Sequence, residues 1–126
     1  SARIRVAMLG TREERMLLIR DCSRVVAMAV LNSPKLSETE MEGFAAMKNI
    51  QEDVMRGMAR NRLFMRNYAV VRALVHNART PIDVGLGLLH HLTAPDLQQV
   101  SRNKSVSDPV RRVATKVFRN KTERGG

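Results

Sequence analysis

The chain has 126 residues, enough for one domain with a single buried core, and its 44% apolar content excludes a chain that is disordered throughout. Its 22 Lys and Arg against 12 Asp and Glu give a formal charge of +10, and aromatic residues make up only 3%. The single cysteine, Cys22, excludes an internal disulfide and a thiolate metal cluster.

No apolar run approaches the roughly 20 residues of a membrane span. Ser1 stands where an initiator Met is expected, and no signal-peptide pattern follows it. We therefore expect a fragment of a longer protein with no membrane span, and the lone cysteine favours a reducing, cytoplasmic location.

Helical segments of about ten residues are predicted along the whole chain, because apolar residues recur at helical spacing and no segment alternates with the period of a strand. The predicted segments are 2–9, 12–20, 23–32, 38–48, 51–60, 67–77, 81–92, 94–102 and 109–119. Helices this short need tertiary packing to be stable. The sequence thus predicts an all-α single domain of about seven to nine short stacked helices over 1–120, followed by a basic flexible tail, 121–126.

Four start signals support these helices. Two of them fit the capping box, in which a hydroxyl and a carboxylate three residues later bond each other's backbone amides. The other two place a capping side chain before a proline at the first helical position. The capping boxes are Thr11 to Glu14 and Ser37 to Glu40, and the proline signals are Thr80-Pro81 and Asp108-Pro109.

Comparing the sequence with itself predicts an internal repeat. Residues 26–35 align with 70–79 at an offset of 44, and residues 50–56 align with 106–112 at an offset of 56. The larger offset indicates one additional short helix in the second half, opened by Thr93. A period in the forties is typical of HEAT and armadillo units. A bundle of amphipathic helices without a repeat is the alternative.

Three stretches resemble known proteins: Leu17–Asp21, Ala29–Pro34, and Asn67–Val70 continuing to Asn77. Through them the chain, over about residues 3–118, resembles a group of uncharacterised bacterial α-helical proteins. Its turns Asn-Ser-Pro-Lys and Asn-Ala-Arg-Thr-Pro are similar to the helix exits of leucine-rich-variant repeat proteins. These resemblances imply an independently folded helical stack and bring no activity, cofactor or site residue.

No pattern of catalytic or metal-ligating residues is found. His90 and His91 are adjacent and point about 100° apart on a helix, so they cannot share a metal comfortably, and His76 is distant in sequence. Gly85 and Gly87 lack the strand and third glycine of a dinucleotide site. Cys22 lies near a helix start but has no histidine close in sequence. We predict that the chain is not an enzyme and has no cofactor or metal.

Positive charge is concentrated in two places, one around 56–66 and one in the last predicted helix. Arg112, Lys116 and Arg119 recur at i, i+4 and i+7 and form one stripe on that helix. The candidate anion or nucleic-acid contacts are Arg56, Arg60, Arg62, Arg66, Arg111, Arg112, Lys116 and Arg119. Ordinary solvated helix faces would give the same pattern.

We predict a non-enzymatic binding or scaffolding module whose first candidate partner is a protein, including a second copy of the chain. The alternative is DNA or RNA bound through its phosphate backbone without sequence preference, since base-reading motifs are missing. Insertion into a membrane surface is disfavoured, because the basic stripe has no aromatic face beyond Phe118.

Overall fold

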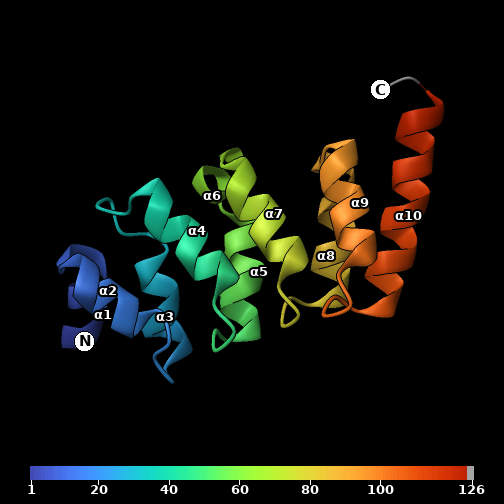
Figure 1. Cartoon of the computed structure of the whole chain (residues 1–126). Coiled ribbons are helices and arrows are strands. Elements are labelled where there is room, and N and C mark those ends of the chain that lie inside the picture. Colours follow the sequence, from blue (N-terminus) through green and yellow to red (C-terminus); the bar gives the residue numbers. More distant parts are fainter. Residues whose placement is uncertain (125–126) are drawn as a thin grey trace.

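A computed structural model describes residues 1–124, which form ten α-helices and one 3-10 turn and contain no β-strand (Figure 1). The elements are α1 (Ala2–Leu9), α2 (Arg12–Leu18), α3 (Arg24–Val30), α4 (Glu38–Ala46), α5 (Glu52–Arg60), α6 (Arg62–Arg66), α7 (Tyr68–His76), α8 (Ile82–Leu88), the turn η1 (Leu89–His91), α9 (Ala94–Arg102) and α10 (Asp108–Glu123). The predicted all-α fold of short stacked helices is confirmed. None of the helices in this range is long and apolar enough to cross a membrane.

The helices stack in two rows that run from left to right in Figure 1. In the first row α1 packs on α3, α3 on α5, and α8 on α10, while the ion pair of Arg56 with Asp83 joins α5 to α8. In the second row α4 packs on α7 and α7 on α9, and the ion pair of Arg15 with Glu40 joins α2 to α4. The core lies between the rows, where Phe44, Phe64 and Leu74 among others are completely buried.

The stack has a regular spacing along the sequence. Second-row helices begin at residues 12, 38, 68 and 94, which are 26, 30 and 26 positions apart. Every long-range hydrogen bond made by a side chain in the described residues joins positions 25 to 32 apart. We call each first-row helix, together with the second-row helix that follows it, a unit. The side chains of each unit therefore form hydrogen bonds with the neighbouring unit.

This spacing corrects the predicted period. The offset of 44 aligned 26–35 with 70–79, which lie at α3 of the first row and α7 of the second, so it relates helices of different rows. The offset of 56 aligned the starts of α5 and α10, which are both first-row helices two units apart. The helix after Thr93 is present as α9, but it is a regular member of the second row rather than an addition.

Asparagine side chains at the helix ends hold successive units together. Asn77, directly after α7, donates to the carbonyls of Ala45 and Met47 at 2.9 and 2.8 Å, at the end of α4. Asn61, directly after α5, donates to the Leu31 carbonyl at the end of α3 at 3.4 Å. Each amide thus satisfies carbonyl groups that a helix end leaves without an intrahelical partner.

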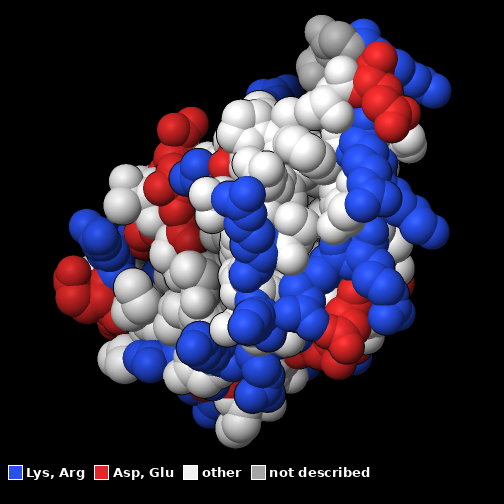
Figure 2. Space-filling view, turned by 45° about the vertical axis from the view of Figure 1, so that its right-hand side comes forward, with Lys and Arg blue, Asp and Glu red and all other residues white. Residues whose placement is uncertain are grey.

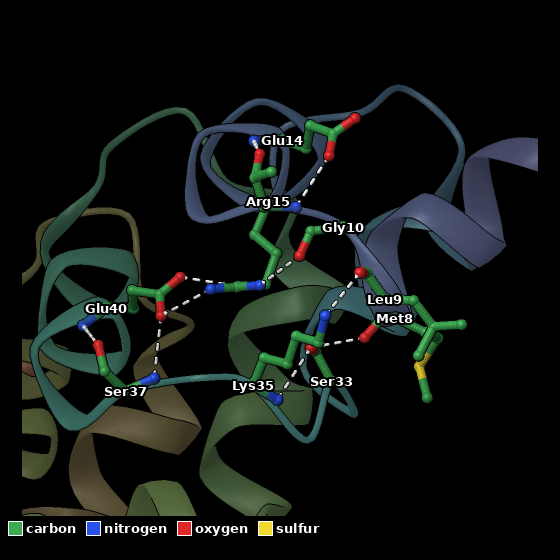
Figure 3. Close-up of polar contacts among 10 residues, drawn as sticks. Met8, Leu9, Gly10, Glu14, Arg15, Ser33, Lys35, Ser37 and Glu40 are labelled. Atoms are coloured by element: carbon green, nitrogen blue, oxygen red, sulfur yellow. Dashed lines mark hydrogen bonds and ion pairs between the residues drawn. The ribbon is translucent and has the colours of Figure 1, made fainter.

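A buried ion pair fixes the first units of the second row (Figure 3). Arg15 donates from Nε and Nη2 to the two carboxylate oxygens of Glu40 at 2.8 and 3.1 Å, and from Nη1 to the Gly10 carbonyl at 2.8 Å. Burial by itself raises the pKa of Glu40, but the hydrogen bonds from Arg15 and from the Ser37 backbone amide outweigh it and lower that pKa. The Ser37 capping box therefore also supplies the partner of Arg15.

The predicted caps are correct at the two capping boxes and wrong at the two prolines, although α8 and α10 begin within one residue of their predicted starts. Both capping boxes are present as predicted. Pro81 is itself the N-cap residue of α8, and the Thr80 hydroxyl is buried without a hydrogen-bond partner. Ser107 rather than Asp108 is the N-cap residue of α10, which puts Pro109 at the second helical position.

The segment at 121–126, predicted as a flexible tail, begins inside α10, which continues to Glu123. Lys121 donates to the carbonyls of His90 and Leu92 at 3.3 and 2.6 Å, so it is tied to the turn after α8. Residues 125–126 of the predicted tail lie outside the described residues.

Candidate interaction surface

The positive charge is unevenly divided along the stack. Residues 1–60 contain ten Lys and Arg against eight Asp and Glu, whereas residues 61–126 contain twelve against four. In Figure 2 the Lys and Arg side chains gather over the α10 end of the molecule and across the middle and lower part of the view, and few acidic groups interrupt them. The second half of the chain therefore attracts anions through its summed field.

Three of the four carboxylates in this half, Asp83, Asp96 and Asp108, already interact with side chains of the chain itself. Asp83 accepts from both terminal nitrogens of Arg56 at 2.7 and 3.0 Å; these bonds lower the pKa of Asp83 and raise that of Arg56. Asp108 is paired with Arg111 within α10. Of the eight predicted contacts, Arg56 and Arg111 are thus engaged in ion pairs.

The other six predicted contacts are exposed, with no carboxylate partner among the described residues, and form two groups. Arg60, Arg62 and Arg66 surround the short helix α6, and Arg112, Lys116 and Arg119 lie on the exposed side of α10. Helix α8 and the turn η1 lie between the groups, since both contact α10 and both line a hollow with Arg66. The six side chains therefore form two separate basic patches, with α8 and η1 between them.

A hollow of about 320 Å³ opens beside Arg66 where α5, α6, α7, α8 and η1 meet. Its lining is Ala59, Met65, Arg66, Tyr68, Val71, Leu88 and His91. Val71 and Leu88 are nearly buried and form an aliphatic base, while Arg66 and His91 are exposed. The hollow thus combines an apolar base with a cationic side chain and a histidine.

Tyr68, which forms the aromatic wall of the hollow, is held in place by hydrogen bonds to the next unit. The Tyr68 hydroxyl donates to the Asp96 carboxylate and accepts from the Thr93 backbone amide at 3.0 Å, at the start of α9. Arg72 lies 3.9 Å from that carboxylate and 6.0 Å from the centre of the Tyr68 ring. Tyr68 is therefore fixed in place, and the nearest carboxylate is occupied.

No protein-family model, curated protein or solved structure matches this chain. The resemblance to bacterial helical-repeat proteins accordingly stays a prediction.

The histidines have separate environments. The His76 ring, half-buried at the end of α7, lies with Nδ1 2.9 Å from Nδ2 of Asn103. Burial lowers the pKa of His76, and the nearby Arg72 adds to this effect while Asp96 opposes it. His90 and His91 are exposed on η1 with ring centres 4.6 Å apart. Among the described residues, no three His, Cys, Asp or Glu side chains are grouped to hold a metal ion.

The sequence prediction missed the hollow because it missed α6 and did not separate η1 from α8. Two asparagines in the sequence indicate the short helix α6. Asn61 caps the backbone amides of Leu63 and Phe64, and Asn67 caps that of Ala69. Asparagine is a favoured N-cap residue, so two asparagines six positions apart are consistent with a short helix between two caps.

Proposed function

We propose that the chain is a non-enzymatic protein-interaction module that binds an acidic segment of a partner protein on the basic surface of its second half. The observation that carries this proposal is the charge division: twelve Lys and Arg against four Asp and Glu in residues 61–126, with Asp83, Asp96 and Asp108 already bound. Complementary charge steers association and selects partners.

A protein partner is favoured over nucleic acid by the aromatic residues. Proteins that bind single strands without sequence preference stack bases on exposed aromatic rings. Here Phe44 and Phe64 are fully buried, Phe118 is half-buried in the packed face of α10, and only Tyr68 is exposed, at 37%. The hollow beside Arg66 instead has an aliphatic base, which suits amino-acid side chains.

Sequence-independent binding of a phosphate backbone is the second candidate. The observation in its favour is the exposed row of Arg112, Lys116 and Arg119 on α10. On a helix rising 1.5 Å per residue, the first and last of these Cα atoms are about 10.5 Å apart along the axis. Several phosphates of one strand fall within that length.

Fluorescence anisotropy with three labelled probes tests the proposal. The probes are a 12-residue peptide of Asp and Glu around a central Leu, a 20-nucleotide single strand and a 20-base-pair duplex, each at about 50 and 200 mM salt. We expect the peptide to bind and to weaken with salt. Tight binding of either nucleic acid without peptide binding would overturn the proposal in favour of the second candidate.

Charge-matched variants locate the surface. Replacing Arg112, Lys116 and Arg119 together with Gln should weaken peptide binding several-fold. The control replaces Arg5, Arg12 and Arg20 with Gln, which removes the same charge from exposed positions of the first two units. Equal losses in both triple variants would show that net charge alone, not this surface, attracts the peptide.

A further inference from the structure

We infer that the hollow between α6, α7 and η1 is the specific anchor site for an aliphatic side chain of the partner, next to an acidic residue that pairs with Arg66. This inference rests on the proposed function and adds the residue pattern that the partner must present. It assigns the occupant as a peptide segment in which Leu, Ile or Val adjoins Asp or Glu.

The size of the hollow limits the occupant. At about 320 Å³ it is at the lower end of the range of ligand pockets, roughly 300–1,000 Å³, so it suits one or two side chains rather than a large ligand. The base formed by Val71 and Leu88 contains no polar side-chain group. An aliphatic side chain placed there would lose contact with water without leaving a polar group of its own unpaired.

Charge complementarity determines what lies beside the aliphatic side chain. Arg66 is exposed at the rim and makes no ion pair among the described residues. The carboxylate nearest the Tyr68 wall, Asp96, accepts from the tyrosine hydroxyl and lies beside Arg72, so it is not placed to neutralise Arg66. A guanidinium in this position can bind an incoming carboxylate through two parallel hydrogen bonds.

The hollow is held in shape before any partner binds. Tyr68 is bonded to the start of α9, the Asn61 side chain caps the start of α6, and the Asn67 backbone amide donates to the Phe64 carbonyl at the end of α6. Asn67 also donates to the Glu42 carboxylate at 3.2 Å, which connects the end of α6 to α4. Side chains fixed in this way lose little conformational freedom on binding.

Two labelled peptides test the inference: the acidic peptide with a central Leu, and the same peptide with Ser in that position. Burial of the leucine predicts about tenfold tighter binding of the Leu peptide. Ala59→Leu places a larger side chain in the hollow and should abolish this preference while leaving the salt-dependent binding of the Ser peptide. Ala69→Leu makes the same change on a half-exposed position outside the hollow lining and should leave the preference intact.

Arg66→Gln should weaken the binding of both peptides by about two- to fivefold, since it removes an exposed ion pair with the peptide carboxylate. Arg20→Gln, at an exposed position of the first units, should change neither. Thermal unfolding of each variant establishes that it is folded before binding is measured.

The outcomes separate the two proposals. Equal binding of the Leu and Ser peptides to the unchanged protein would overturn the anchor site and leave the proposed function standing. Binding of neither peptide would overturn both. A preference for Leu that survives Ala59→Leu in a folded variant would also overturn the assignment to this hollow, as would binding of only the 20-nucleotide strand.

Discussion

Removing Arg15 should be among the most damaging single changes in the stack. Its side chain is 5% exposed and that of Glu40 is 2% exposed, and the pair is joined by two hydrogen bonds. Arg15→Met keeps the unbranched stem but leaves the Glu40 carboxylate buried with the Ser37 amide as its remaining hydrogen-bond partner. Loss of one partner of a buried ion pair costs about 3–5 kcal/mol, a large part of a typical stability of about 5–15 kcal/mol.

The stability lost in Arg15→Met should depend on pH in a definite direction. In the unchanged protein the pKa of Glu40 is lowered, so the pair stabilises the fold above the ordinary carboxyl pKa and this contribution is lost as the pH falls through the lowered value. Without Arg15 the burial that raises this pKa is opposed mainly by Ser37, so the carboxyl protonates more readily in the folded protein. The deficit of Arg15→Met should therefore be largest near neutral pH and should shrink in acid.

Urea unfolding of four proteins at pH 7 and pH 4.5 measures the effect: the unchanged chain, Arg15→Met, Glu40→Gln and the double variant. The double variant should be less destabilised than the sum of the two single variants, because no uncompensated charge remains buried. Additive losses within about 0.5 kcal/mol, or a deficit that does not change with pH, would refute the reasoning.

Four further changes can be measured by the same unfolding assay. Asn77→Ala removes both bonds to the carbonyls at the end of α4 and should cost about 1–3 kcal/mol; a loss below about 0.5 kcal/mol would contradict the role of asparagine between units. Gly43→Ala should stabilise the protein by about 0.5–1 kcal/mol, because alanine loses less conformational freedom than glycine inside a helix and the added Cβ has no neighbouring atom within 4 Å. Gly10→Ala should destabilise it, because its Cβ would lie 2.5 Å from a backbone oxygen, and a gain at this position would count against the packing described. His76→Gln should flatten the loss of stability below about pH 6.5, since burial lowers the pKa of His76 and the unfolded chain binds its proton more readily; an unchanged slope would exclude this contribution.

Most of the fold could be predicted because interactions between residues close in sequence determine where its helices begin. The hydroxyl of Thr11 and the carboxylate of Glu14 satisfy each other's backbone amides within four residues, so their spacing alone is informative. The two proline signals placed the helices but not their caps. Pro81 is buried and lies one position before the helix, and no hydroxyl caps α8.

The candidate surface was only partly predictable, because ion pairing depends on the stack. Arg56 and Arg60 are both charged positions of α5, yet Arg56 binds a carboxylate 27 positions later while Arg60 is exposed. Glu52, four residues before Arg56, is a local partner that Arg60 lacks, but the pair of Arg56 with Asp83 is set by the spacing between units and has no local signal. The hollow was hidden for the same reason, because its lining comes from five elements.

The spacing also explains where the surplus charge is found. An arginine of one first-row helix pairs with the second residue of the next: Arg24 with Asp53, 29 positions apart, and Arg56 with Asp83, 27 positions apart. Helix α8 contains no basic residue to continue this series, and Asp108, the acidic residue at the start of α10, pairs instead within its own helix. Among the described residues, no ion pair therefore joins α8 to α10. Arg112, Lys116 and Arg119 on the exposed side of α10 accordingly make no ion pair among the described residues, and they lie on the same half of the stack as the hollow beside Arg66.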